Sequence, residues 1–152
     1  MSRRAGEGAV ALGLLCLVVL ALQVVSSRVI SPAIHSEEEL YNAAHALIIR
    51  DGGWDLAWPF RYQNECGGCA VVAGMGSVVF SWVSPSIGAW RSIGLLFFSL
   101  ALVSGIALGW KVARYWGAGA VALVFAAAPP TYQELAMLVN GNHSEGGALL
   151  LA

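Results

Sequence analysis

Three adjacent carboxylates, Glu37, Glu38 and Glu39, are the residues of this chain best placed to do chemistry. They are three of only 9 acidic residues in a chain of 152. An apolar run long enough to cross a bilayer precedes them, so we expect them close to a membrane surface. A charged group near lipid is costly unless it faces water, a partner or a substrate. Glu37 and Glu38 are therefore candidate catalytic carboxylates that could accept a proton from a substrate.

The same acids also have a purely structural explanation. The segment Ser36-Glu37-Glu38-Glu39 fits the capping box of a helix N-terminus, with Glu39 reaching back to the cap. Acidic residues in a first helical turn also complement the helix dipole, which stabilises a helix by about 0.3–1 kcal/mol for each residue. On local evidence alone, this explanation accounts for Glu37 and Glu39 without any catalytic role.

The spacing of apolar residues predicts a helix over residues 36–50 that lies along the membrane surface. Its apolar stripe is expected to comprise Leu40, Ala43, Ala44, Leu47 and Ile48. A different face carries Glu38, Tyr41 and His45. Tyr41 is a candidate substrate-binding residue because it shares the face of Glu38, whereas His45 is interpreted as a surface or packing residue.

The composition is that of an integral membrane protein. Hydrophobic residues make up 58% of the chain and charged residues 11%, against about 25% charged residues in a typical soluble domain. The net charge of −1 gives no long-range field that would attract nucleic acid, so the expected partner is the lipid bilayer. The predicted fold is all-α: a bundle of transmembrane helices with an amphipathic interfacial helix in the first outer loop.

The first predicted transmembrane span covers residues 8–25, which contain no charged residue. Arg3 and Arg4 precede it and favour a cytoplasmic N-terminus. The alternative is a cleaved signal peptide that ends near Val25-Ser26-Ser27. Under either interpretation, residues 26–68 form a loop outside the cytoplasm.

Two further spans are predicted, over residues 92–110 and 117–139. Lys111 and Arg114 lie between them and mark a cytoplasmic end. Residues 69–87 are apolar but short, and a crossing there would turn Lys111 and Arg114 outward, so we interpret them as a re-entrant or interfacial helix. The third span is expected to be kinked at residues 129–130, a diproline. Residues 146–152 look like the start of a truncated fourth span.

A polar turn over residues 140–147 is expected on the same outer side as the three glutamates. It carries His143 and Glu145, which could complete a site for a divalent metal ion with nitrogen and oxygen ligands. The alternative is a polar turn that caps the next helix.

The chain has 3 cysteines, and two of them form the C-x-x-C motif Cys66-Gly67-Gly68-Cys69 in the outer loop. Such a pair can shuttle electrons, which makes a quinone-linked thiol-redox protein an alternative function. A structural disulfide or two buried thiols explains the same residues. Cys16 stands alone within the first span.

The order of these parts resembles a known family. A first span is followed by an outer loop with Ser-Glu-Glu-Glu-Leu-Tyr-Asn-Ala-Ala and Gly-Gly-Trp, and the second span is followed by Ala113-Arg114-Tyr115-Trp116-Gly117-Ala118. This arrangement resembles the N-terminal part of the polytopic membrane glycosyltransferases of the GT-C class, above all the bacterial members related to protein mannosyltransferases and aminoarabinose transferases (family 39 type). The family usually has Asp-Glu where this chain has Glu37-Glu38.

The resemblance implies transfer of a sugar from a polyprenyl-phosphate carrier to an acceptor, on the outer side of the bacterial inner (plasma) membrane. Glu37 or Glu38 would then be the base. A divalent metal ion, or an arginine such as Arg61 or Arg91, could hold the phosphate. His143 would contact the substrate or, with Glu145, bind the metal ion. A non-catalytic membrane scaffold subunit is the remaining alternative.

Overall fold

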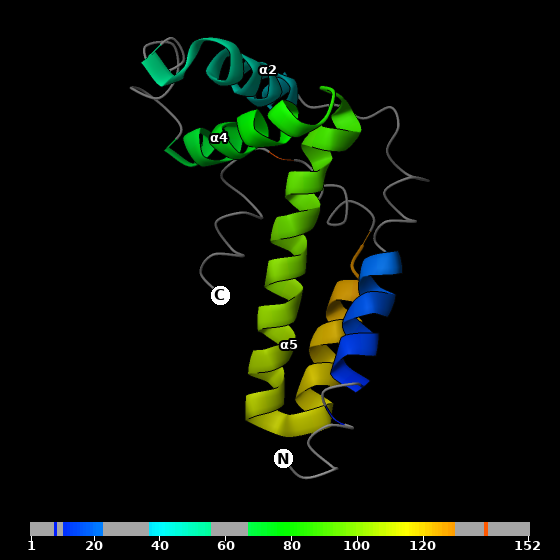
Figure 1. Cartoon of the computed structure of the whole chain (residues 1–152). Helices are drawn as coiled ribbons and strands as arrows, with labels where there is room; N and C mark the ends of the chain where they lie inside the picture. The colour runs from blue at the N-terminus through cyan, green and yellow to red at the C-terminus, as the bar shows by residue number, and fades with distance from the viewer. Residues whose placement is uncertain (1–7, 9–10, 23–36, 56–66, 130–138, 140–152) are drawn as a thin grey trace.

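The computed structural model describes residues 8, 11–22, 37–55, 67–129 and 139. The described elements are the helices α2 (Glu37–Gly52), α4 (Gly67–Trp82) and α5 (Ile87–Ala126), together with a shorter apolar helix, Ala11–Leu22 (Figure 1). Within these ranges there is no β-strand. The predicted all-helical class is therefore confirmed for the part of the chain that the structure describes.

Helix α5 consists of two arms joined by a sharp reversal (Figure 1). Two residues at the reversal have non-helical backbone angles: Ala113 (φ −137°, ψ 24°) and Arg114 (φ 54°, ψ −132°). The first arm, residues 87–112, begins at Ser86, whose side chain accepts a hydrogen bond from the backbone N–H of Ala89 at 3.1 Å. At 1.5 Å per residue this arm is about 39 Å long, which exceeds the hydrocarbon thickness of a bilayer.

Among the described residues, α5 is the one helix that is long and apolar enough to cross a membrane. Its first arm contains the span predicted at residues 92–110, and its second arm contains the first part of the span predicted at 117–139. Lys111 and Arg114 lie at the reversal between the arms. The helix ends at Ala126, before the predicted kink, and residue 130 lies outside the described residues.

The two arms approach each other closely near the reversal, where both carry glycine. A Cβ atom added to Gly109 would lie 2.6 Å from the carbonyl oxygen of Gly117, a backbone atom that cannot turn away. Further along the arms, the rings of Phe98 and Phe125 make an edge-to-face contact with centroids 5.4 Å apart. Small residues thus allow backbone contact at the closed end of the hairpin, and aromatic residues fill the space beyond it.

The helix Ala11–Leu22 completes a three-helix bundle with the two arms of α5 (Figure 1). Their shared core comprises Val19, Phe98, Leu102, Ile106, Ala118 and Ala122. Gly8, just before this helix, lies beside the rings of Trp110 and Tyr115 at the reversal. The N-terminal end of the first helix therefore lies at the same end of the bundle as Lys111 and Arg114.

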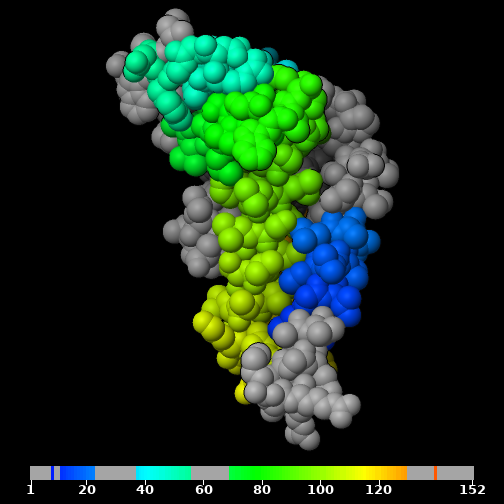
Figure 2. All heavy atoms as spheres, in the orientation of Figure 1, coloured from blue at the N-terminus to red at the C-terminus, as the bar shows by residue number. Residues whose placement is uncertain are grey.

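Helices α2 and α4 form a separate layer at the opposite end of α5 (Figures 1 and 2). α4 lies across the start of α5, and α2 packs on α4. The core between them contains Ala46, Val72, Phe80, Trp90, Ile93, Phe97 and Val139. Gly76 of α4 is essential to this contact, because a Cβ there would lie 2.4 Å from the ring of Trp90 and 2.8 Å from Ala46.

Four serines within the apolar helices satisfy their hydroxyl groups locally. Ser77, Ser81, Ser92 and Ser99 each donate to a backbone carbonyl three or four residues earlier, at 2.6 to 2.8 Å. A hydroxyl bonded in this way needs neither water nor a partner helix. These serines are therefore compatible with an apolar surrounding.

The glycine contact between the arms can be tested with alanine. We expect Gly109→Ala to lower the free energy of unfolding by about 1–3 kcal/mol, because overpacking forces the backbones apart. Gly119→Ala is the matched control, since a Cβ there meets no atom within 4 Å. Reversible unfolding in mixed detergent micelles would measure both. Equal stability of the two variants would contradict the described packing of the hairpin.

Candidate functional site

The face that α2 turns toward the rest of the molecule is distinct from its apolar stripe. Its buried residues are Glu39, Asn42, His45, Ala46 and Ile49. Leu40, Ala44 and Ile48 of the predicted stripe are exposed or lie off the packed face, and Ala43 and Leu47 are only partly buried. The apolar stripe is therefore separate from the packed face, and its contact with a membrane surface stays a prediction. On the packed face a charged residue points inward, because a countercharge lies opposite it.

That countercharge is Arg91, in the first turns of α5. Its Nε donates to Oε1 of Glu39 and its Nη2 donates to Oε2, both at 3.0 Å. The Glu39 side chain is fully buried and that of Arg91 is 14% exposed. Paired, parallel hydrogen bonds of this kind are the strongest geometry available to an arginine and a carboxylate. They join two helices whose paired residues are 52 positions apart in the sequence.

The pair also compensates two charges that are removed from water. Glu39 lies in the first turn of α2, where a negative charge complements the partial positive charge of the backbone N–H groups. Both oxygens of Glu39 accept from the Arg91 guanidinium, so the cation is neutralised where it is buried. Conversely, a buried Glu39 carboxylate without Arg91 would be costly. Each charge is therefore tolerable only because of the other.

The two predicted catalytic residues differ from Glu39 in their surroundings. Glu37 is exposed and Glu38 is half-buried. Among the described residues, neither carboxylate takes part in an ion pair. Of the three adjacent acids, Glu37 and Glu38 are therefore the ones that remain accessible to a substrate.

Tyr41 and His45 lie one turn apart on α2 and contact each other. Their ring centroids are 4.4 Å apart at a tilt of 44°, and Nδ1 of His45 is 2.9 Å from the backbone oxygen of Tyr41. His45 is buried, as a packing residue would be, whereas Tyr41 is 44% exposed. Tyr41 is thus accessible on α2 one turn after Glu37 and Glu38, as a substrate-binding role requires.

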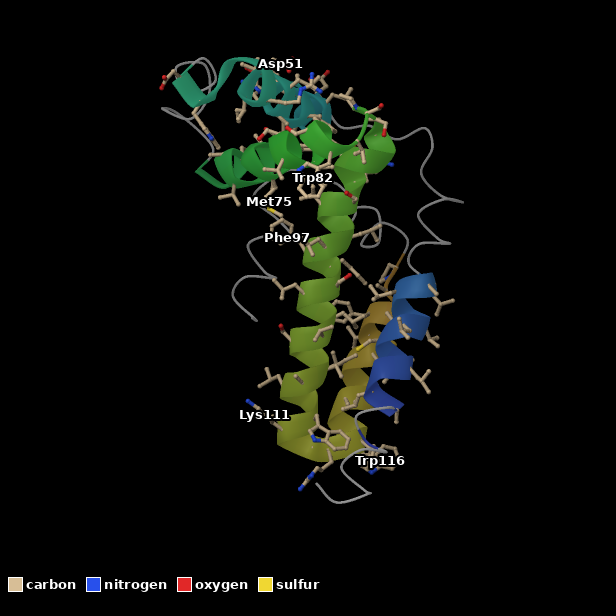
Figure 3. The ribbon with its side chains drawn as sticks, viewed as in Figure 1. Asp51, Met75, Trp82, Phe97, Lys111 and Trp116 are labelled. Atoms are coloured by element: carbon tan, nitrogen blue, oxygen red, sulfur yellow. The ribbon has the colours of Figure 1, made fainter. Side chains whose placement is uncertain are left out.

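Arg50 connects the far end of α2 to α4. Its guanidinium donates to both carboxylate oxygens of Asp51, at 2.6 and 3.0 Å, and to the backbone oxygen of Phe80 at 3.4 Å. The carbonyl of Phe80 belongs to the last turn of α4, where carbonyl groups lack helical partners. The hydrogen bonds from Arg50 lower the pKa of Asp51 below its ordinary value. Figure 3 shows Asp51 on the outer surface of the layer.

Three of the predicted site residues, Arg61, His143 and Glu145, lie outside the described residues. Within the described ranges, no three His, Cys, Asp or Glu side chains gather closely enough to hold a metal ion. Val139 is described, and it is fully buried in the core shared by α2, α4 and α5. The chain therefore returns at Val139 to the layer that carries Glu37 and Glu38.

Cys69, the second cysteine of the C-x-x-C motif, is disulfide-bonded. Its side chain is fully buried and packs with Ile49 and Ala73 between α2 and α4. Cys66 lies outside the described residues, and Cys16 is a free thiol. Thiol–disulfide exchange requires access to sulfur, so the burial of Cys69 favours the structural role over electron shuttling.

A scan against protein-family models, a search of curated proteins and a search of solved structures each found no match for this chain. The assignment of the site therefore depends on its own geometry. Sequence reasoning overlooked the ion pair between Glu39 and Arg91, although a signal was present. Glu39, Asn42, Ala46 and Ile49 follow a helical repeat, and Arg91 stands in an otherwise apolar segment.

The pair makes a sharp prediction about stability. We expect Glu39→Gln to lower the free energy of unfolding by about 3–5 kcal/mol, because it leaves the Arg91 guanidinium buried without its countercharge. Glu37→Gln is the matched control on the same turn, where an exposed substitution should change stability by less than about 0.5 kcal/mol. Hydrogen exchange of α2 amides and unfolding in micelles would measure both. Similar values for the two variants would show that the pair does not hold α2 in place.

Proposed function

We propose that this chain is the N-terminal part of a membrane glycosyltransferase of the GT-C type, which transfers a sugar from a polyprenyl-phosphate carrier to an acceptor outside the cytoplasm. The observation that carries the proposal is the bidentate bond between Glu39 and Arg91. It holds the helix with the accessible glutamates against the end of an apolar helix that is long enough to cross a bilayer. Carboxylates at that boundary are placed to meet a substrate whose lipid chain lies in the membrane.

The distribution of charge and cysteine supports an orientation with α2 and α4 outside. Lys111 and Arg114 lie at the reversal of α5, and cationic loops favour the cytoplasmic side. The disulfide-bonded Cys69 belongs to the opposite layer, and disulfides persist in oxidising compartments outside the cytoplasm. Exposed tryptophans occur toward each end, Trp82 in α4 and Trp116 at the reversal, as at two lipid–water interfaces (Figure 3).

In this reaction, Glu38 would act as the general base. A nucleophilic group of the acceptor attacks the anomeric carbon of the sugar, and the bond between that carbon and the phosphate oxygen breaks. The acceptor's proton passes to the carboxylate, and the lipid phosphate departs with the bonding electrons. Glu39 is unsuited to this role because both of its oxygens already accept hydrogen bonds from Arg91. Glu37, more exposed on the same turn, would orient the acceptor or share the role of base.

The departing phosphate needs positive charge nearby. Arg91 was a candidate for this role, but its guanidinium binds Glu39 and is largely buried. We therefore assign Arg91 to positioning α2. In this proposal the phosphate is stabilised either by Arg61 or by a divalent metal ion that His143 and Glu145 bind. The described residues provide no three-ligand metal site of their own.

The proposed base can be tested in a full-length enzyme that contains this segment. We expect Glu38→Gln to lower the rate of sugar transfer by about 10²–10⁴-fold, the range typical of a lost general base. Membrane insertion and stability should stay unchanged, because Glu38 makes no ion pair among the described residues. Transfer of a radiolabelled sugar from a synthetic polyprenyl phosphate would measure the rate. A wild-type rate in the Glu38→Gln variant would exclude Glu38 as the base.

The proposed geometry also requires one orientation. Single cysteines introduced at Glu37 and at His143, in a chain whose Cys16 is replaced by serine, should both react with a membrane-impermeant maleimide from outside the cell. A cysteine at Lys111 should react only after permeabilisation. Labelling of positions 37 and 143 from opposite sides would rule out a shared site. Independently, loss of transfer on chelation with EDTA, and its recovery with Mg²⁺ or Mn²⁺, would establish the metal requirement.

A further inference from the structure

The reversal of α5, residues 111–116, concentrates positive charge that no carboxylate among the described residues neutralises. The structure describes four basic side chains: Arg50, Arg91, Lys111 and Arg114. Arg50 pairs with Asp51, and Arg91 pairs with Glu39. Within the described part of the chain, Lys111 and Arg114 have no acidic partner. The four described basic residues thus divide into two that are neutralised, at the α2–α4 layer, and two without an acidic partner, at the reversal.

The Arg114 guanidinium lies over an aromatic ring. Its central carbon lies 5.9 Å from the ring centroid of Trp110, within cation–π distance. Trp110 in turn contacts Tyr115 edge-to-face, with centroids 4.6 Å apart. Arg114 has φ of 54°, a value uncommon for a residue with a side chain. This backbone reversal leaves both Lys111 and Arg114 exposed at the tip of the hairpin.

Large apolar side chains lie beside these cations. Val112 is 80% exposed and Trp116 is 88% exposed. Figure 3 shows Lys111 and Trp116 at the end of α5 farthest from α2. A surface that alternates cations with exposed apolar and aromatic groups matches the two parts of an anionic phospholipid, whose phosphate is negative and whose acyl chains are apolar.

We infer that the reversal of α5 binds the phosphate groups of anionic phospholipids in the leaflet that it faces. Charge complementarity favours an anionic phospholipid as the bound molecule, because Lys111 and Arg114 supply positive charge that no described carboxylate neutralises. Val112 and Trp116 supply contacts to its acyl chains. A basic residue near an anionic membrane surface contributes about fivefold in association. The inference depends on the membrane location proposed above but not on sugar transfer, and neither Lys111 nor Arg114 has a catalytic role in that proposal.

The test uses the purified full chain reconstituted in phosphatidylcholine vesicles with trace spin-labelled phosphatidylglycerol or spin-labelled phosphatidylcholine. Electron paramagnetic resonance measures the fraction of each lipid held at the protein surface. We expect the wild-type chain to prefer phosphatidylglycerol by about fivefold or more, and the preference to weaken at high salt. The double variant Lys111→Gln/Arg114→Gln should lower the preference for phosphatidylglycerol over phosphatidylcholine to about one. Lys111→Gln alone should roughly halve the logarithm of that preference.

Two control variants test whether the lipid preference depends on the residues of the reversal or only on the net charge of the protein. Arg50→Gln removes one positive charge from the other end and should keep the preference. Arg114→Lys keeps the positive charge and should retain most of the preference for phosphatidylglycerol. The inference is overturned if the wild-type chain shows no preference, if the double variant keeps it, or if Arg50→Gln abolishes it equally. If the double variant loses helicity by circular dichroism, the single Lys111→Gln variant decides. Loss of sugar transfer by Glu38→Gln leaves these results unaffected, so the two proposals can fail separately.

Discussion

The bond between Glu39 and Arg91 is the interaction on which the arrangement of the described helices most depends. It joins α2 to the start of α5 through two hydrogen bonds of 3.0 Å in a buried setting. A buried ion pair adds little net stability compared with apolar packing, because removing both charges from water is costly. Its effect is instead on specificity: α2 can rotate or slide only by exposing one charge to an apolar surrounding. The pair therefore selects one orientation of α2.

That orientation determines what the three adjacent glutamates can do. Side chains at successive helix positions point about 100° apart, so the burial of Glu39 turns its two neighbours toward the surface. Glu37 is exposed, and Glu38 lies at the edge of the packed face. One acid of the cluster is thus structural, and the other two remain available for a substrate. A structural role for Glu39 and a catalytic role for Glu38 are compatible, because the two residues lie on different faces of α2.

The two ends of the molecule are built on different principles. At the reversal of α5, glycine allows backbone contact between Gly109 and Gly117, and the basic residues described there are uncompensated. At the α2–α4 layer, the described basic residues are each paired, and a disulfide-bonded cysteine lies in the core. The proposed orientation requires this asymmetry, since cationic loops favour the cytoplasmic side and disulfides persist outside it.

Composition and the spacing of apolar residues were sufficient to predict the helical class, the apolar stretch that forms α5 and the position of its basic reversal. These features depend on composition and on the spacing of residues within one segment, so they need no knowledge of distant contacts. Which face of α2 turns inward was decided only by the tertiary structure. The periodicity of apolar residues marks a stripe that includes Leu40 and Ile48, but it cannot reveal a buried glutamate whose partner lies 52 positions away. The close contact of Gly109 with Gly117 was likewise hidden, because a glycine's neighbours across a hairpin are set by the fold and not by the residues beside it.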